Sequence, residues 1–596
     1  MMVSSLRPLL AFVRPYRRQV SVGLLLLIGV QVINVAIPLV LKWAIDAGKN
    51  GLDALQLPGA APGALTDQLK GQMGYYAVVL VALGLAQWLL TAGMRWYLTV
   101  AARSVERDIR ALYIRKLLSL PLSFFQQRRV GDLMSRATSD LEMIHRFLNN
   151  VFRMTLTSLL LFVLSLALML TIDAKLTLYA LAPIPLVAIT SRIVAGKMRV
   201  GFRKVQEQFA VMVTAIQENL SGIRTLKAFA RRTSETERFG RHNEAYIDLN
   251  RRLVLIRSLF FPFTSLLNSL AMIVVLWLGG LRMIEGSLTL GAFVAFNTFL
   301  IRLGRPMTLL GRMVDEYGRA ITSMARISAI LNETPQETEG RLSQPPPPIR
   351  GEIEFRNLHF AYTDQPVLED ITVRIPAGSS LGIVGRIGSG KSTLARLVPR
   401  LIEAGRGQVL IDGIPVEDYP LHTLRDAIGY VPQDTFLFSE TIRDNIALGL
   451  TGTDDDQVRD AAEVSQLSAD LEQLPEGLDT VLGERGVTLS GGQKQRTALA
   501  RAVIRTPNIL ILDDALASVD AHTEVEILSR LKSVMASRTT ILITHRLSAA
   551  RFADRILVLE NGRVAEQGSH DELIAMNGLY TDMYRRQNLI EKLDEL

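Results

Sequence analysis

One short segment of the sequence carries the residue types that can enclose a phosphate group. It reads LGIVGRIGSGKSTLARLV, and its Gly385, Gly390, Lys391 and Ser392 have the spacing G-x-x-x-x-G-K-[ST] between an apolar run and a helical pattern. Backbone N–H groups of such a loop bind phosphate oxygens, the lysine reaches the outer phosphates, and the serine hydroxyl is a ligand for Mg²⁺. The segment therefore predicts a site for a nucleotide with Mg²⁺.

A second segment, NILILDDALASVD, places two carboxylates side by side after an apolar run. The run is predicted to be a buried strand, and Asp513 at its end is expected to reach the Mg²⁺ shell, as the second-motif acid of P-loop NTPases does. Asp514 then stands where a general base or a group that positions the attacking water belongs. The alternative for Asp514 is a solvated acid at the start of a helix.

The elements that hold these motifs are predicted by the pattern of the second half of the chain. From Gly351 onward, short strand-like runs alternate with helical patterns; the runs are GEIEFRNLHFAY, LGIVG, QVLIDG, NILILDD, TTILITH and RILVLENGRV. Strands separated by helices favour a parallel α/β domain. The segment before it, TPQETEGRLSQPPPPIRG, cannot pack a core and is interpreted as a linker.

The first half of the chain contains six apolar stretches that could cross a membrane. A helix of about 20 apolar residues spans the hydrocarbon core, and the six stretches are 20–41, 75–90, 154–172, 176–191, 259–280 and 288–301. The fourth and sixth are weaker, and a buried soluble helix is the alternative for each. The connections 101–150 and 200–257 keep helical apolar spacing with few Gly or Pro, so we expect the span helices to continue into the cytoplasm.

The net charge of +8 comes with basic residues beside these stretches, at the N-terminus and between the second and third. Lys and Arg are retained on the cytoplasmic side and contact anionic lipid headgroups, so both termini are expected in the cytoplasm. Nucleic-acid binding is the rival interpretation of a basic chain, but no basic stripe with interleaved aromatic residues is present. The chain has no cysteine, which excludes disulfides, thiol catalysis and thiolate metal sites.

Motifs in a fixed order give the chain a family resemblance. LSGGQKQR (489–496) lies just before NILILDD, Gln433 and Asp434 lie between the two phosphate motifs, and ITHR (543–546) follows. Together they resemble the nucleotide-binding domain of an ATP-binding cassette (ABC) transporter. PLSFFQQRRVGDLMSRATSDLEMI and ENLSGIRTLKAF are similar to the intracellular loops of ABC exporters. Six spans before one cassette is the half-transporter plan, so the resemblance implies an ATP-driven exporter that works as a dimer.

The predicted fold is therefore a membrane α-helical domain with six transmembrane helices of exporter type, followed by an α/β P-loop nucleotide-binding domain. Residues 1–331 are expected to form the transmembrane domain with its cytoplasmic helical extensions, 332–350 the Pro-rich linker, and 351–596 the ABC nucleotide-binding domain. The resemblance implies an integral protein of the bacterial cytoplasmic (inner) membrane, with the ATPase domain in the cytoplasm.

The resemblance also implies roles for single residues. Tyr362 would stack on adenine, His545 would contact the γ-phosphate, Gln433 would link Mg²⁺ to the membrane domain, and Asp520 would bridge the dimer. The ATP phosphates would be held by Gly385, Arg386, Ile387, Gly388, Ser389, Gly390, Lys391, Ser392 and Thr393, and the Mg²⁺ by Ser392, Gln433 and Asp513. The signature, made of Leu489, Ser490, Gly491, Gly492 and Gln493, would cap ATP bound to the partner subunit.

One position departs from the family pattern. Most active members have glutamate after the second-motif aspartate, whereas this chain has Asp514, whose carboxylate is one methylene shorter. Because position decides whether a general base holds the water, we predict ATP binding but slow hydrolysis at this chain's own site. An intact signature beside a weakened base favours a heterodimer with a second ABC half-transporter. A homodimeric exporter and an ATP-gated channel or regulatory subunit are the alternatives, and the six spans argue against a soluble DNA-repair ATPase.

Candidate substrate contacts are charged residues close to the spans. Lys42, Arg302 and Arg305 are such residues, and snorkelling to the lipid boundary is the alternative for them. The substrate is expected to be a lipophilic or amphipathic drug, lipid or peptide, and an anionic one if Arg302 faces the pore. Two connections, 120–125 and 221–226, are expected to couple membrane and ATPase domains, together with GERG (483–486); ordinary helix packing is their alternative.

Overall fold

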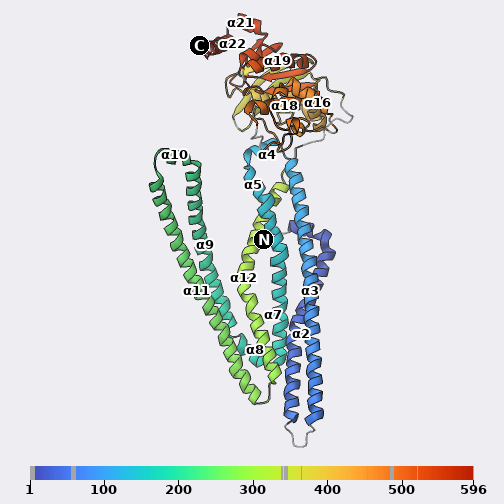
Figure 1. The fold of residues 1–596 in the computed structure, drawn as a ribbon, viewed down its shortest axis with the longest axis vertical. Helices are drawn as coiled ribbons and strands as arrows, with labels where there is room; N and C mark the ends of the chain where they lie inside the picture. Colours follow the sequence, from blue (N-terminus) through green and yellow to red (C-terminus); the bar gives the residue numbers. More distant parts are fainter. Residues whose placement is uncertain are drawn as a thin grey trace. The chain divides into compact units, whose positions relative to one another are not determined.

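The computed structural model describes residues 7–55, 62–336, 340, 347–363, 365–450, 452, 454–483, 489–519 and 521–594. The chain divides into two compact units, Met1–Leu118 with Arg129–Glu333, and Ser119–Arg128 with Thr334–Leu596. The first unit consists of helices and the second contains all the strands (Figure 1). Each unit has its own hydrophobic core.

The first unit is built from long helices because its apolar stretches are neither interrupted by turn residues nor rich in charge. Its elements are α1 (Arg7–Val13), η2 (Arg14–Tyr16), α2 (Arg17–Leu55), α3 (Pro62–Leu118), α5 (Val130–Ser135), η3 (Arg136–Asp140), α6 (Leu141–Arg146), η4 (Phe147–Val151), α7 (Phe152–Ile172), α8 (Ala174–Leu181), α9 (Ile184–Ser221), α10 (Ile223–Ala228), α11 (Arg232–Ile284) and α12 (Leu290–Leu331). The 57 residues of α3 give a helix of about 85 Å. The prediction that the span helices continue beyond the apolar stretches is confirmed.

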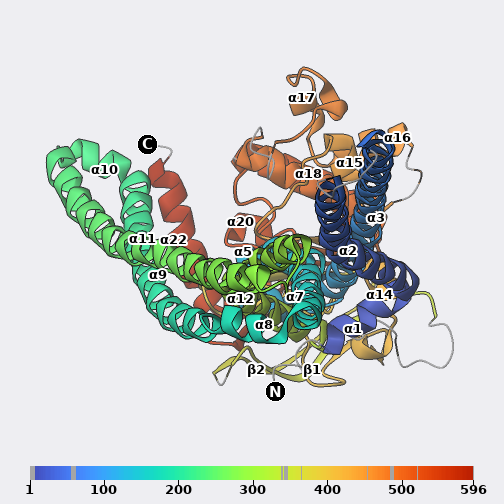
Figure 2. The ribbon, with the colours of Figure 1, turned by 90° about the horizontal axis from the view of Figure 1, so that it is seen from below.

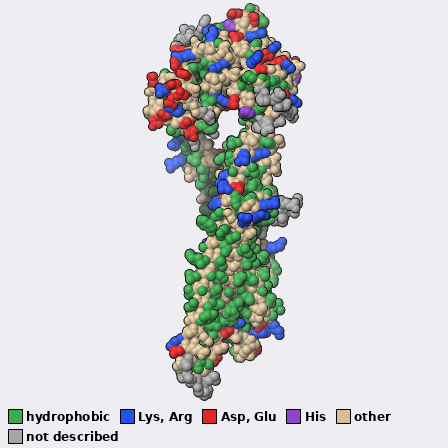
Figure 3. All heavy atoms as spheres, turned by 90° about the vertical axis from the view of Figure 1, so that its right-hand side faces the viewer, with side chains coloured by type: hydrophobic (Ala, Val, Ile, Leu, Met, Phe, Trp, Pro, Cys, Tyr) green, Lys and Arg blue, Asp and Glu red, His purple; other side chains and the backbone are tan. Residues whose placement is uncertain are grey.

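Helices occupy all six predicted spans. Among the described residues, four helices are long and apolar enough to cross a membrane, Pro8–Leu55, Leu65–Leu118, Val130–Ile172 and Arg232–Ile284, and Leu290–Leu303 is a shorter apolar helix. The fourth predicted span is divided between α8 and α9, because Pro183 and Pro185 lack the N–H groups of a continuous helix. Figure 3 shows hydrophobic side chains covering the membrane helices on the face that it presents.

Helices α9 and α11 pack along each other and form an arm whose tip is α10. The arm leads away from α2, α3, α7 and α12 (Figures 1 and 2). Near the other end of the arm, the core of the unit gathers side chains of several helices, including Val35 of α2, Met169 of α7, Val275 of α11 and Phe299 of α12. The arm thus presents α10 away from this core.

The second unit contains two sheets. The six-stranded sheet has the order β10-β9-β3-β8-β7-β6, and the four-stranded sheet the order β2-β1-β4-β5. The strands are β1 (Ile353–Ala361), β2 (Pro366–Ile375), β3 (Ser380–Gly385), β4 (Val409–Ile411), β5 (Ile414–Pro415), β6 (Ile428–Val431), β7 (Ile509–Asp513), β8 (Thr539–Ile543), β9 (Arg555–Glu560) and β10 (Arg563–Gly568). Strands β6, β7, β8, β3 and β9 run parallel, so their carboxyl ends share one edge, where α/β folds bind ligands.

Short helices surround these sheets. They are α4 (Leu122–Gln127), α13 (Lys391–Leu397), η5 (Val416–Asp418), α14 (Leu421–Asp426), α15 (Ile442–Ile446), α16 (Asp455–Val464), α17 (Ser468–Leu471), η6 (Gly477–Asp479), α18 (Gly491–Val503), α19 (Ala521–Met535), α20 (Leu547–Ala550), α21 (His570–Met576) and α22 (Leu579–Asp594). The segment Ser119–Arg128, which includes α4, groups with this unit, and the Gln336 N–H donates to the Ser119 carbonyl at 2.9 Å. This segment contains 120–125, one of the two connections expected to couple the domains; the other, 221–226, lies at α10.

Candidate nucleotide-binding site

The phosphate loop joins β3 to α13. All six residues of β3 are buried, which fixes the start of the loop. Gly385 has φ 150°, and a Cβ there would lie 2.2 Å from the Leu559 carbonyl oxygen; Gly390 has φ 96°, and a Cβ would lie 2.6 Å from a methyl group of Leu368. Only glycine fits both positions, so packing as well as phosphate approach requires the two glycines.

The lysine of the loop is held in place by two hydrogen bonds to the backbone of the loop. The Lys391 Nζ donates to the carbonyl oxygens of Gly385 at 2.8 Å and Arg386 at 2.9 Å. Burial lowers the pKa of Lys391, and the neighbouring carboxylates of Asp514 and Asp513 oppose this change. The ammonium therefore lies inside the loop, within reach of the phosphates that the loop is predicted to bind.

The first acid of the pair is fully buried at the end of β7. Asp513 accepts a hydrogen bond from the Ser392 hydroxyl at 2.7 Å and one from the Tyr430 hydroxyl at 3.4 Å. Burial raises the pKa of Asp513, and it also raises the pKa of Tyr430 to about 12. Tyr430 was not predicted as a site residue, because only the pairing of β6 with β7 brings it there.

Mg²⁺ would be held by the hydroxyl of Ser392 and the carboxylate of Asp513. Within the described part of the chain, no group of three or more His, Asp or Glu side chains could hold a metal ion. Two oxygen ligands from the protein fit Mg²⁺, because this ion is usually bound by few side chains together with phosphate oxygens and water.

The second acid has a different environment. Asp514 has φ 52°, and its backbone N–H donates to the Ile543 carbonyl at 2.9 Å, so its Cα is fixed beside β8. Its side chain is half-buried, and the Gln433 Nε2 donates to Oδ2 at 3.5 Å. The structure therefore brings together Asp514 and Gln433, two of the three predicted catalytic residues. The third, His545, is exposed just after β8.

The remaining predicted contacts lie around the loop. The Tyr362 and Thr393 hydroxyl groups are 3.4 Å apart, and Tyr362 packs edge-on against Phe360, which leaves part of its ring exposed at the loop. Ile387 is 92 % exposed at the tip of the loop, with Arg386 and Gly388 also exposed and Ser389 buried.

The signature begins α18. Ser490 is the N-cap residue: its hydroxyl accepts from the Gln493 N–H at 3.2 Å, and the Gln493 side-chain oxygen accepts from the Ser490 N–H at 2.9 Å. Leu489 is buried, whereas a Cβ at Gly491 or Gly492 would lie within 3.3 Å of Ser518. The signature backbone thus packs tightly against Ser518. The backbone N–H groups of the first turn of α18 have no partner within the helix, and such groups at a helix N-terminus bind anions. Asp520 and residues 484–486 of GERG lie outside the described residues.

A helical unit of membrane-crossing length and a P-loop domain on one chain define a membrane-bound ATPase of the P-loop class. Residues 20–307 match the family described as ABC transporter transmembrane region, and residues 368–517 match ABC transporter. The chain is 34% identical to the probable multidrug resistance ABC transporter ATP-binding/permease protein YheI of Bacillus subtilis, over 99% of this chain and 98% of that protein. This chain therefore belongs to the ABC transporter family.

Two further similar proteins are named as a lipid flippase and as an exporter. An ATP-dependent lipid A-core flippase of Syntrophus aciditrophicus is 35% identical over 82% of each chain. A bacterial Atm1-family ABC exporter, solved with ATP bound, has a TM-score of 0.76 and 29% identity, over 96% of this chain and 98% of that one. The predicted fold class, an exporter-type helical membrane domain followed by a nucleotide-binding domain, is confirmed.

Proposed function

We propose that this chain is one half of a dimeric ABC exporter that uses ATP with Mg²⁺ to move lipophilic or amphipathic compounds across the bacterial inner membrane. The support is the phosphate loop with Lys391 and the Ser392–Asp513 pair, on a chain whose relatives are named for multidrug export and lipid A-core flipping. Both termini and the ATPase domain face the cytoplasm in this proposal, as the basic flanks indicate.

The partner is a second half-transporter, since the signature caps nucleotide on another subunit. Ser490 and Gln493 hold each other's backbone N–H groups, so the signature backbone is ordered within this chain alone. At the tip of the arm, Leu220 and Ile223 line a hollow of about 820 Å³, and Leu220, Ile223 and Phe229 are between 44% and 74% exposed. Exposed apolar side chains around a hollow suit contact with a partner subunit.

The observation that supports a heterodimer is Asp514. Its Cα is fixed by the hydrogen bond to Ile543, so its shorter side chain cannot be brought forward by a backbone shift without losing that bond. A well-placed general base contributes about 10² to 10⁴ in rate. This chain's own site therefore hydrolyses ATP slowly, and the exporter is a heterodimer whose partner supplies the competent base.

The test is the change Asp514→Glu in the heterodimer made with a partner whose site has been inactivated. We expect hydrolysis of ATP to rise about tenfold or more with little change in ATP binding, because the added methylene moves the carboxylate toward the water. Lys391→Ala in the same background is the control and should remove ATP binding at this site. If the rate of ATP hydrolysis does not change after Asp514→Glu, the short side chain of Asp514 is not the cause of slow hydrolysis.

The assembly is tested separately. Purification of this chain alone and with each candidate partner, followed by ATPase assays, distinguishes the homodimer from the heterodimer. If this chain alone forms a stable homodimer that hydrolyses ATP as fast as the pair, the heterodimer is refuted and the homodimeric exporter is supported. Transport of substrate against a gradient in vesicles distinguishes the exporter from an ATP-gated channel.

A further inference from the structure

Four polar side chains on three helices form a hydrogen-bonded chain inside the apolar part of the membrane unit. The Gln87 Nε2 of α3 donates to the Asn34 Oδ1 of α2 at 3.0 Å, and the Asn34 Nδ2 donates to the Gln31 Oε1 at 3.4 Å. From α12, the Arg302 guanidinium donates to the backbone carbonyl of Asn34. Gln31 is buried and the other three are half-buried. A permanently charged group of α12 therefore lies beside amides of the first and second spans.

The helix itself explains why that carbonyl is free to accept. In a regular helix the Asn34 carbonyl would accept from the N–H four residues later, but this residue is Pro38, which has no N–H. Inside a membrane a carbonyl released in this way needs another donor from the protein. Arg302 is that donor, so one N–H of the guanidinium has a structural role and fixes where the group lies.

Counting along the helices places the group deep in the membrane. Helices α2 and α12 touch at their outer ends, where a Cβ on Gly291 would lie 2.2 Å from the Lys42 carbonyl oxygen. At about 1.5 Å per residue, Asn34 lies about 12 Å and Arg302 about 17 Å from this contact, in a hydrocarbon core of about 30 Å. With the end of the apolar stretch 20–41 taken as the boundary, Lys42 lies at it and Arg302 lies about 12 to 17 Å inside it. The Arg305 side chain lies outside the described residues.

The Arg302 guanidinium has more hydrogen-bond donors than its bond to the Asn34 carbonyl uses. It carries five N–H donors and no deprotonated form at neutral pH. Among the residues that the structure describes, Arg302 forms no ion pair, in contrast to Arg282, which pairs with Asp173 at 2.5 Å outside the apolar region. A cation at this depth is costly and marks a functional position by default. Its fork geometry matches a carboxylate or a phosphate.

We propose that Arg302, held by the Asn34 carbonyl, is the position in the membrane domain that binds the anionic headgroup of an amphipathic substrate. The amides of Gln87 and Asn34 lie beside it to bind polar atoms of the same headgroup. This inference rests on the proposed export function and names its substrate class. The same chemistry is offered by a substrate and by an anionic lipid of the bilayer.

The experiment compares two probes that differ only in a phosphate, 1-myristoyl lysophosphatidic acid and 1-myristoyl glycerol, binding to the full-length chain in zwitterionic nanodiscs. We expect the phosphate probe to bind at least about tenfold more tightly, and Arg302→Gln to remove this preference, because a hydrogen bond to a charged group contributes a factor of that size. Arg302→Lys, which keeps the charge but loses the fork, should retain part of it. Arg203→Gln, an equal change of charge on an exposed side chain of α9, should leave it intact.

Pro38→Ala gives a second and independent variant. It restores the helix N–H that competes for the Asn34 carbonyl, so Arg302 remains present but loses its fixed position, and the preference should fall. A preference that survives both Arg302→Gln and Pro38→Ala would overturn the proposal and leave Arg302 with its structural bond alone. If anionic lipid in the nanodisc competes with the probe, the site takes a bilayer headgroup; if it does not, the site takes a discrete substrate.

The outcome is separable from that of the export proposal. ATP binding and transport by the same variants report on export, whereas probe binding without ATP reports on Arg302. Absence of ATP-driven transport by the unmodified protein, together with an Arg302-dependent preference for the phosphate probe, would refute the exporter and keep the anion site.

Discussion

Asp470 fixes the side chain of the signature glutamine. Its carboxylate accepts from the Gln493 Nε2 at 3.1 Å and pairs with Arg496 at 2.5 Å, while the Gln493 oxygen is bonded to the Ser490 N–H. We predict that Asp470→Ala, which frees this amide, raises the KM for ATP of the dimer about three- to tenfold and changes kcat less, since one charge-assisted hydrogen bond is lost. ATPase assays over a range of ATP concentrations measure this.

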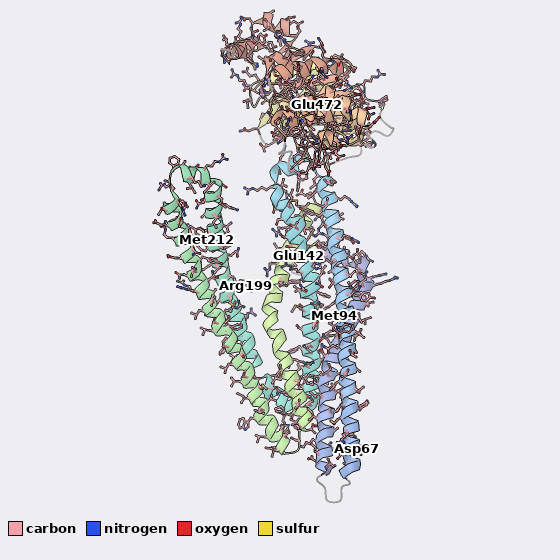
Figure 4. All side chains as sticks on the ribbon, viewed as in Figure 1. Asp67, Met94, Glu142, Arg199, Met212 and Glu472 are labelled. Atoms are coloured by element: carbon pink, nitrogen blue, oxygen red, sulfur yellow. The ribbon has the colours of Figure 1, made fainter. Side chains whose placement is uncertain are left out.

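Two further variants separate positioning from general damage. Asp470→Glu should restore part of the ATP affinity, because the carboxylate is kept. Glu472→Ala, at an exposed position two residues further on (Figure 4), should leave KM unchanged. Equal KM values for Asp470→Ala and the unmodified chain would refute the role of Asp470.

Residues such as Lys391 and Asp513 are predictable from sequence because their spacing is local to one loop or one strand end. Tyr430, Asp470 and the pairing of Arg302 with Asn34 are not, because strand register and helix packing bring together residues far apart in the chain. The release of the Asn34 carbonyl by Pro38 was the one signal in the sequence for the last of these, and it does not reveal the donor.

At the scale of elements, α6 lies between two π-helical turns, η3 and η4, and carries a buried histidine. The His145 Nδ1 lies 3.4 Å from the Glu106 carboxylate, which accepts from Arg103 and Arg110. Burial of the imidazole lowers the pKa of His145, and the positive charge of the nearby Arg103 lowers it further. The carboxylates of Glu106 and Glu142 oppose this change only in part. The folded protein therefore holds His145 neutral.

This lowered pKa predicts a loss of stability in acid. The unfolded chain binds a proton at His145 near the ordinary pKa of about 6.5, whereas the folded chain binds it only at lower pH, so stability present above about pH 6.5 falls as the pH drops below it. Melting temperatures measured at pH 7.5 and 5.5 should differ less in His145→Asn than in the unmodified protein. An equal difference in both would show that His145 does not contribute.

The elements differ in how well the sequence predicts them. Spans such as 20–41 follow from length and hydropathy alone, since the membrane is an apolar solvent. The division between α8 and α9 follows from Pro183 and Pro185, which a hydropathy average over 176–191 does not register. The two π-helical turns leave no periodic signal, because each inserts one residue into an otherwise regular helical register.

For the whole molecule, export requires that ATP binding at one unit changes the membrane helices of the assembly. The arm of α9 and α11 ends in α10, whose exposed Ile223 and Phe229 are available to a partner subunit in the proposed dimer. Such a contact would transmit closure of the nucleotide-binding domains to the helices that hold substrate. In the proposed heterodimer, slow hydrolysis at Asp514 would keep ATP bound through several turnovers of the partner's site.

The arm therefore gives a prediction for the assembly. Ile223→Ser with Phe229→Ser should reduce substrate transport at least about tenfold while each chain still binds ATP, because the apolar contact contributes about 1.5–3 kcal/mol per buried side chain. Transport and ATP binding measured on the same vesicles test this. Met576→Ser, which removes an exposed apolar side chain from the nucleotide-binding unit, is the control and should leave transport unchanged. If the double variant transports normally, α10 does not carry the coupling, and another contact of the dimer must.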